Sequence, residues 1–295
     1  MGKIIDIIKE GKILVSDGAW GTFLQKKGLQ PGECPELWNI TRPEEVFEVA
    51  RSYVDAGADM IETNSFGGTR FKLEKYGLGD RVFELNKAAA AISRKAAGKK
   101  FVLGSVGPTG KILMMGDVTE EEMYEAFKEQ CQGLEAGGAD AIMIETMSDL
   151  DEARLAVRAA KENTSCEVFC TMTFEKTVGG EFRSMMGVSP TDMANTLIGE
   201  GAELIGANCG NGIANMIGIV KEIRQIDRDI PVLVHANAGM PVYNDGETVF
   251  PETPDEMSSR VREIIDAGAN IVGGCCGTTP DHICKVREVV DGKYA

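Results

Sequence analysis

The feature that most constrains the fold is a repeated alternation of short apolar runs with longer amphipathic segments. Each run is almost continuously apolar, as expected for parallel strands covered on both faces. The segments between them, such as 83–98 and 255–267, carry apolar residues at helical spacing. The runs predict strands at 13–18, 59–64, 101–106, 140–146, 167–174, 203–209, 231–237 and 270–276.

Eight strands, each followed by a helix, are the count of a closed (β/α)8 barrel, or TIM barrel. A doubly wound sheet usually has fewer strands and needs a glycine-rich phosphate turn after the first. The segment DGAWGT (17–22) does not match that turn. The length of 295 residues suits one barrel. We therefore predict an α/β protein in which residues 1–295 form a single barrel domain.

A weak internal repeat supports the barrel. The segments that lead into alternate strands each combine a helix ended by glycine, a short turn and a buried strand: DAGADMI, EAGGADAIMI, GEGAELI and DAGANIV. Three loops that leave strands are longer, at 106–117, 174–190 and 238–254. Because barrel active sites lie at the carboxyl ends of the strands, we expect the functional site among these loops.

Charge and hydropathy exclude several classes of partner. The formal net charge of −15 repels phosphate backbones and acidic membranes, so we expect no nucleic-acid or membrane partner. No apolar run approaches the ~20 residues that span a bilayer. The start, MGKIIDIIKEGK, lacks the apolar core of a signal peptide. We expect a cytoplasmic protein, in which clustered cysteines indicate metal binding or catalysis more than disulfides.

Three of the eight cysteines fall at strand ends that a barrel brings together. Cys209 closes the sixth predicted strand, and Cys275 and Cys276 close the eighth. Only the seventh strand separates these two, so the thiols can converge at the rim. Neighbouring residues of a regular strand point to opposite faces, so the chain must leave its pleat at the Cys275–Cys276 pair. The flanking glycines give it the freedom to do so.

Three thiolates suit Zn²⁺, which in catalytic sites keeps three protein ligands and one exchangeable position. A thiol substrate entering that position would lose its proton and become a nucleophile. Only two histidines, His235 and His282, are present, so a site dominated by histidine is excluded. The alternative is that these cysteines are small buried apolar residues. We assign that structural role to the other five, Cys34, Cys131, Cys166, Cys170 and Cys284.

Seven motifs stand in order along nearly the whole chain: DGAWGT (17–22), ETNSFG (62–67), GPTG (107–110), IET (144–146), GANCG (206–210), ANAG (236–239) and GGCCGTTPDH (273–282). Together they resemble the homocysteine S-methyltransferase family, and above all the homocysteine-binding domain that opens cobalamin-dependent methionine synthases. The resemblance implies an enzyme that transfers a methyl group to the thiol of homocysteine, giving methionine, with zinc held by Cys209, Cys275 and Cys276.

The resemblance also implies substrate contacts. Asn237 matches a position that can occupy the fourth metal site until substrate arrives, although an Asn there can simply form a turn. Asp17 and Glu145 suit the ammonium of an amino acid; their alternative is as solvated or capping acids. The backbone amides from Ala19 to Gly21 suit the substrate carboxylate. Trp20 departs from the smaller or aliphatic residue usual there, and it either walls the pocket or packs.

The methyl donor is expected to come from outside the chain, because no cobalamin module follows the barrel in this sequence. Candidates are a methylated corrinoid carried by a partner protein, S-methylmethionine and betaine. Family members that use S-methylmethionine tend to carry Arg after the cysteine pair, where this chain has Gly277. With two tryptophans and five tyrosines, no aromatic cage for a quaternary ammonium is evident. The corrinoid protein is therefore favoured, docked on the long rim loops.

Two other classes stay open. The chain can be a non-catalytic zinc-bearing subunit of a corrinoid system, although a retired site would not need Cys209, Cys275, Cys276, Asp17 and Glu145 together. It can also be a barrel aldolase or sugar-phosphate enzyme. That reading needs a Schiff-base lysine at a strand end, and no predicted strand ends in lysine.

Overall fold

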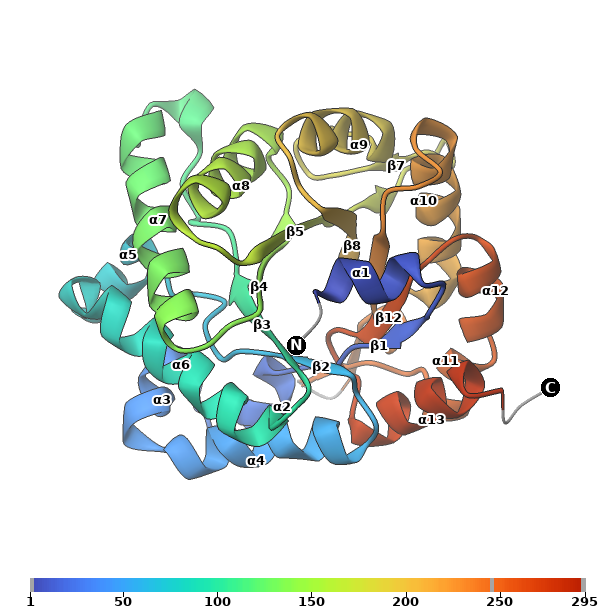
Figure 1. The fold of residues 1–295 in the computed structure, drawn as a ribbon, viewed down its shortest axis with the longest axis horizontal. Helices are drawn as coiled ribbons and strands as arrows, with labels where there is room; N and C mark the ends of the chain where they lie inside the picture. Colours follow the sequence, from blue (N-terminus) through green and yellow to red (C-terminus); the bar gives the residue numbers. More distant parts are fainter. Residues whose placement is uncertain (1–2, 245–246, 293–295) are drawn as a thin grey trace.

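The computed structural model describes residues 3–244 and 247–292. Eight parallel strands form the inner wall of a barrel and helices surround them (Figure 1), which confirms the predicted (β/α)8 fold. Each observed strand overlaps the predicted one. The strands are β1 (Leu14–Val15), β2 (Met60–Glu62), β3 (Phe101–Val106), β4 (Ala141–Met147), β5 (Glu167–Met172), β8 (Leu204–Gly212), β9 (Val232–Asn237) and β12 (Ile271–Gly274).

The strand order is β1-β12-β9-β8-β5-β4-β3-β2, so β9 lies between the two strands that carry the clustered cysteines. The ends of this order, β1 and β2, are joined through Asp59. Its amide donates to the carbonyl of Val15 at 2.7 Å, and its carboxylate accepts from the Val15 amide at 3.0 Å. That residues 1–295 form one domain stays a prediction, since the two ends, and residues 245–246 of the predicted loop 238–254, lie outside the described residues.

The helices vary widely in length, and the longer ones cover the outside of the barrel. None among residues 3–244 and 247–292 combines the length and apolar character that crossing a membrane requires. The α-helices are α1 (Ile4–Lys9), α2 (Gly21–Lys26), α3 (Trp38–Thr41), α4 (Pro43–Asp55), α5 (Arg70–Leu73), α6 (Val82–Ala97), α7 (Glu120–Ala136), α8 (Leu150–Asn163), α9 (Pro190–Gly199), α10 (Ile213–Ile226), α11 (Pro254–Ser258), α12 (Val261–Asp266) and α13 (Pro280–Val290).

The predicted repeat before alternate strands is a recurring helix end. In the first copy, Gly57 adopts φ of 101° and the amide of Ala58 donates to the carbonyl of Tyr53 at 3.1 Å. This bond and the left-handed glycine are the pattern of a Schellman cap, which an L side chain at the glycine would strain. The same combination of positive φ and bond recurs at Gly138, Gly201 and Gly268.

The amino-terminal end of the barrel is filled, which leaves the opposite mouth for function. Apolar side chains from the strands, such as Leu103 and Phe169, pack inside it with Ile4 and Ile8 of α1. Helix α1 lies over this end (Figure 1). The carboxylate of Glu167 on β5 holds α1 in place by accepting hydrogen bonds from the amides of Ile4 and Ile5.

The long loops at the carboxyl-end mouth contain two short hairpins that the sequence did not predict. Strands β6 (Glu175–Lys176) and β7 (Phe182–Arg183) pair within the predicted loop 174–190. Strands β10 (Val242–Asn244) and β11 (Glu247–Val249) pair within 238–254. Both are antiparallel pairs of two or three residues, too short to give a periodic signal in the sequence.

Candidate metal centre and its cavity

Cys209 lies near the carboxyl end of β8, where the strand departs from regular geometry. The pairing of β8 with β9 shifts register between Asn208 and Gly212. Cys209 itself adopts φ of 57°, in the left-handed region that few non-glycine residues occupy. Backbone strain of this kind persists where the surrounding structure enforces it, and it is concentrated at functional sites.

The Cys275–Cys276 pair leaves the pleat of β12, as the sequence predicted. The strand ends at Gly274, and the amide of Thr278 closes a turn onto the carbonyl of Cys275 at 3.1 Å. Gly277 adopts φ of 81° in this turn, and a Cβ there would lie 2.3 Å from the Cβ of Phe250. A side chain at Gly277 is therefore excluded unless the loop that carries Phe250 moves.

The three thiols meet at the mouth of the barrel. Their sulfur atoms all lie within 4.8 Å of one another, and those of Cys209 and Cys276 are 3.8 Å apart. Zinc–sulfur bonds of about 2.3 Å in a tetrahedron place sulfur atoms about 3.8 Å apart. The donor set and its spacing therefore fit Zn²⁺. Elsewhere in residues 3–244 and 247–292, no other group of three such ligands converges in this way.

The thiols interact electrostatically. Hydrogen bonds from Cys275 and then Cys276 lower the pKa of the Cys209 thiol. The same bonds raise the pKa of Cys275 and Cys276, because each faces the negative charge of Cys209. Only one sulfur readily carries a charge unless a cation neutralises the others, and this is the electrostatic condition in which a bound metal is most favoured.

Asn237 ends β9 beside this group. Its side chain is buried and hydrogen-bonds Cys209, which helps to lower the pKa of that thiol. Its Oδ1 atom has no hydrogen-bond partner among the described residues. A buried amide oxygen without a partner next to three thiols is a suitable fourth neighbour for a metal.

A cavity of about 410 Å³ opens above the cysteines. Of the residues predicted for the site, Ala19, Trp20, Gly21, Glu145 and the three cysteines line it. Asp17 and Asn237 lie near it but not among the lining residues. Further polar lining comes from the ends of other strands and the loops after them, including Glu36, Glu62, Asn64, Ser105 and His235.

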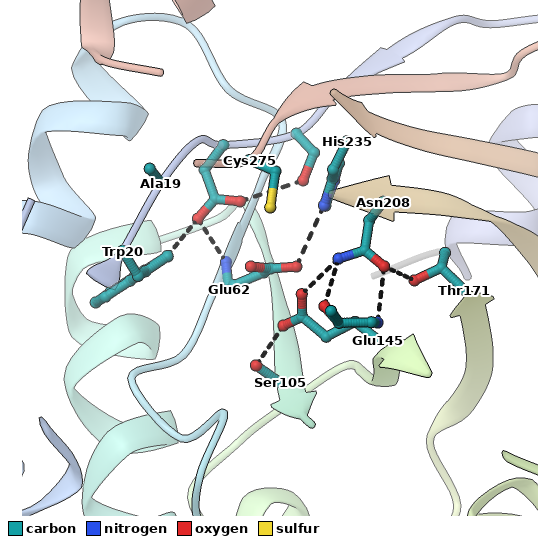
Figure 2. Close-up of polar contacts among 12 residues, drawn as sticks. Ala19, Trp20, Glu62, Ser105, Glu145, Thr171, Asn208, His235 and Cys275 are labelled. Carbon is teal, nitrogen blue, oxygen red and sulfur yellow. Dashed lines mark hydrogen bonds and ion pairs between the residues drawn. The ribbon is translucent and has the colours of Figure 1, made fainter. Parts of the chain in front are cut away.

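Asp17 is buried and hydrogen-bonded to Trp20, whose indole nitrogen points toward the acidic residues of the cavity (Figure 2). Its Oδ2 atom accepts hydrogen bonds from the Trp20 indole and from the Glu62 amide, both at 2.8 Å. Burial, and then the charge of Glu62, raises the pKa of Asp17 to about 7. Trp20 therefore lines the cavity, and its indole is also held in place by Asp17. Both roles considered for this residue from the sequence, lining the pocket and packing, are present.

Glu145 extends from β4 and is held at both oxygens. The Ser105 hydroxyl donates to Oε1 at 2.5 Å, and the Asn208 amide donates to Oε2 at 3.2 Å. Burial, and then the charge of Glu62, raises the pKa of Glu145 well above its usual range. A fixed, buried carboxyl group of this kind gains from a cationic ligand, which restores the interactions lost from water.

Asn208 positions Glu145 and was not singled out from the sequence. Glu145 and Glu62 line one side of the cavity, which we call the acidic wall. Oδ1 of Asn208 accepts from the Thr146 amide and the Thr171 hydroxyl, both at 2.7 Å. Its Nδ2 donates to Thr146 Oγ1 at 2.6 Å as well as to Glu145. Thr146 has φ of 59°, so Asn208 ties a strained residue of β4 to the neighbouring strands.

Thr278 connects the cysteine turn to the first loop. Its hydroxyl accepts from the amide of Ala19 at 3.1 Å and donates to the carbonyl of Cys275 at 2.7 Å. The Ala19 amide is therefore engaged within the protein. The amides of Trp20 and Gly21 have no acceptor among the described residues, so they remain available to an anionic group in the cavity.

The remaining cysteines and His282 lie elsewhere. Burial raises the pKa of the Cys131 and Cys170 thiols, which keeps both in the unreactive protonated form. His282 in α13 is buried and hydrogen-bonds Thr279 and the carbonyl of Glu252. It therefore fastens the loop before α11 to α13 and does not face the sulfur atoms.

The molecule thus belongs to a definite class: (β/α)8 barrels in which converging thiols form the floor of an acidic cavity. A family model described as homocysteine S-methyltransferase matches residues 14–290, and the chain belongs to this family.

Relatives agree with this assignment. The methionine synthase of Mycobacterium tuberculosis (strain ATCC 25618 / H37Rv) is 34% identical over 306 residues, which cover 97% of this chain and 25% of the relative. That of Mycobacterium leprae (strain TN) is 34% identical over 303 residues, covering 95% and 24%. The chain thus spans about a quarter of these relatives. The metallated form of the Escherichia coli homocysteine methyltransferase MmuM shares the fold, with 22% identity, a TM-score of 0.79 and coverage of 96% and 98%.

Proposed function

We propose that this protein transfers a methyl group to the thiol of homocysteine, giving methionine, at a Zn²⁺ ion held by Cys209, Cys275 and Cys276. The observation that carries the proposal is the convergence of the three sulfur atoms, within 4.8 Å of one another, at the floor of the cavity. Family membership supports the acceptor, and the existence of a metallated form of MmuM supports the metal. When bound, the zinc supplies a positive centre that keeps a thiol ligand deprotonated at neutral pH.

The chain's own residues prepare the site for the sulfur end of the substrate. Cys209 is held in its left-handed conformation by the irregular end of β8, and the turn after β12 aims the cysteine pair at it. Asn237 would be the fourth neighbour of a Zn²⁺ ion held by the three cysteines, at the position that a thiol substrate would take. Its unpartnered Oδ1 atom supports this role.

The amino-acid end of the substrate lies against the acidic wall. Asp17 and Glu145 contribute negative charge that favours the α-ammonium. The amides of Trp20 and Gly21 receive the α-carboxylate, since they precede or begin α2 and have no other acceptor among the described residues. Ala19 shapes this loop through its bond to Thr278. Trp20 closes the side of the cavity and keeps water from the reacting sulfur.

The methyl donor is a corrinoid carried by a partner protein. The rim of the cavity supports this choice, because large apolar side chains stand exposed on the three long loops: Met114 at 82%, Met185 at 83% and Tyr243 at 80%. Exposed apolar groups of this size mark surfaces that another molecule covers, and methionine adapts to such partners. Gly277 supports it further, because Phe250 occupies the space that the Arg of S-methylmethionine users would need.

One assay tests the function and the donor together. The purified protein is incubated with homocysteine and each of several donors at equal concentration, and methionine is measured. The donors are a methylated corrinoid protein, free methylcobalamin, S-methylmethionine, betaine and S-adenosylmethionine. We expect fast turnover with the corrinoid protein and slow turnover with free methylcobalamin, which lacks positioning.

Turnover with S-methylmethionine or betaine, and none with either corrinoid, would reject the corrinoid as the donor. It would leave the assignment of homocysteine as the acceptor unchanged. If no donor gives methionine, the better interpretation is a non-catalytic, zinc-bearing subunit of a corrinoid system. The cytoplasmic location expected from the sequence stays a prediction.

A further inference from the structure

A short segment that follows the hairpin of β10 and β11 packs directly on the main chain beside the candidate metal ligands. It consists of residues 250–252, which we call the brace. A Cβ at Gly277 would lie 2.3 Å from the Cβ of Phe250, and a Cβ at Gly239 would lie 3.0 Å from the Cγ of Glu252. Because two glycines make room for it, the brace lies closer to the backbone than any side chain at Gly277 would allow.

Backbone hydrogen bonds connect the brace to the cysteine turn. The amide of Glu252 donates to the carbonyl of Ala238 at 3.0 Å, and the amide of Ala238 donates to the carbonyl of Cys276, also at 3.0 Å. Ala238 directly follows Asn237 in the chain. The main chain therefore joins the brace to two of the four side chains assigned to the metal, so a displaced brace would disturb both.

His282 of α13 holds the brace from the other side. Its ring is buried, and Nε2 lies 3.0 Å from the carbonyl oxygen of Glu252. Nδ1 lies 3.1 Å from the amide nitrogen of Thr279 and 2.9 Å from its hydroxyl. Since a backbone N–H can only donate, Nδ1 is the acceptor and the ring proton is on Nε2, which donates to Glu252. One imidazole thus joins the start of α13 to the brace.

This arrangement requires a neutral ring. A proton on Nδ1 would face the N–H of Thr279, which is also a donor. Burial lowers the pKa of His282 and outweighs the Glu252 carbonyl and the Asp281 carboxylate, which favour the charged form; Lys26 of α2 opposes it as well. The ring is therefore neutral near pH 7, with one acceptor and one donor, and both are used.

We propose that His282 is a positioning residue for the metal centre: it seats the brace, and the seated brace holds the cysteine turn and Asn237 in place around the ion. The inference rests on the proposed function for the identity of that ion. The side chain at this position must accept from the Thr279 amide and donate to the Glu252 carbonyl at once. A neutral imidazole does both, and so does the carboxamide of glutamine.

The first test measures the rate of zinc release. Zinc-loaded protein is mixed at neutral pH with an excess of the chelating dye 4-(2-pyridylazo)resorcinol, whose absorbance reports free zinc. We expect His282→Ala to release zinc about tenfold faster, the scale of one or two net hydrogen bonds. His282→Gln should restore slow release, because glutamine forms the same helix cap and its amide nitrogen can donate to Glu252.

A matched control removes a helix cap elsewhere. Thr119→Ala deletes the hydroxyl that accepts from the Glu122 amide at the start of α7, a helix that does not contact the brace. It should lower Tm and leave zinc release at the parent rate. A general loss of stability would instead accelerate release in both Thr119→Ala and His282→Ala.

A double variant tests whether His282 acts through the brace. Phe250→Ala loosens the brace at Gly277 and should also accelerate zinc release. Because both changes act on one element, the double variant should release zinc little faster than the faster single variant, whereas independent effects would multiply.

Hydrogen exchange provides a measurement that does not need zinc. The amides of Ala238 and Thr278 donate to the carbonyls of Cys276 and Cys275. In the metal-free protein, peptides that contain these amides should exchange faster in His282→Ala and Phe250→Ala, and at the parent rate in His282→Gln.

Parent-like zinc release and exchange in His282→Ala would overturn the inference. So would a His282→Gln variant that behaves as His282→Ala, or effects that multiply in the double variant. Failure of the proposed function gives a different result. If the parent holds no zinc while exchange at Ala238 and Thr278 still depends on His282, the metal is rejected and the positioning of the cysteine turn by His282 stands.

Discussion

Replacing Asn208 by Ala tests how far the acidic wall depends on one buried amide. Four hydrogen bonds disappear, two that Asn208 accepts and two that it donates. At about 1 kcal/mol net for each, the loss approaches 4 kcal/mol, and water entering from the cavity would reduce it to about 2 kcal/mol.

The corresponding change in Tm follows from the size of the chain. With an unfolding entropy of about 2.1 cal/mol/K per residue, 295 residues give about 0.6 kcal/mol/K. We therefore expect Asn208→Ala to lower Tm by about 3–6 °C. Methionine affinity should fall with it, because Glu145 loses the donor that fixes Oε2 and Thr146 is released from its strained conformation.

Thermal unfolding and calorimetry with methionine provide the measurements. Asn163→Ala is the control, because this half-buried residue of α8 donates two hydrogen bonds on the outside of the barrel. It should lower Tm by a smaller amount and leave methionine binding intact. The reasoning is refuted if Asn208→Ala unfolds at the parent temperature, or if it is destabilised as expected but binds methionine with unchanged affinity.

Three further predictions concern the metal and the charge of the site. Metal analysis should find about one zinc per chain, lost on replacing any of the three predicted ligands by Ala but kept in Cys131→Ala and Cys284→Ala; undiminished zinc in all variants would reject the site. X-ray absorption at the zinc edge should show one more sulfur and one fewer oxygen or nitrogen neighbour when homocysteine binds, and an unchanged spectrum at saturation would reject thiol coordination. Methionine should bind more tightly as pH rises from 6 to above 8. Burial raises the pKa of Asp17 to about 7 and of Glu62 to about 8, so the carboxylates that favour an ammonium form only in that window. The same shifts destabilise the ligand-free fold as pH rises from the ordinary pKa values of these groups, 3.8 and 4.5, to about 7 and 8. Methionine binding that weakens from pH 6 to 8 would contradict the assignment.

The pattern of the sequence was sufficient for the barrel and for the location of its sulfur atoms. Eight almost continuously apolar runs, separated by amphipathic segments, are expected of parallel strands buried on both faces, and the observed strands overlap the predicted ranges. Strand order then brings Cys209 and the Cys275–Cys276 pair together, because only β9 separates β8 from β12. Glycines next to the pair indicated that the chain would leave its pleat there.

The acidic wall could be predicted only in part. Asp17 and Glu145 were singled out because they end predicted strands within recognisable motifs, and of the two Glu145 lines the cavity. Glu62 also opens such a motif, but strand periodicity does not reveal which carboxylate keeps a free oxygen. Asp17 is withdrawn from the cavity by bonds to Trp20 and Glu62, and these depend on the packing of β1 against β2.

Contacts between distant segments decided the rest. The Ala19 amide meets the Thr278 hydroxyl across 259 positions, and this bond removes one of the three amides expected for the substrate. Asn208 joins three strands through one side chain, which nothing in its local sequence indicates. Local sequence determines backbone periodicity and burial. The direction of a side chain at a strand end, and the partner it finds, depend on neighbours that only the closed barrel brings within hydrogen-bonding distance.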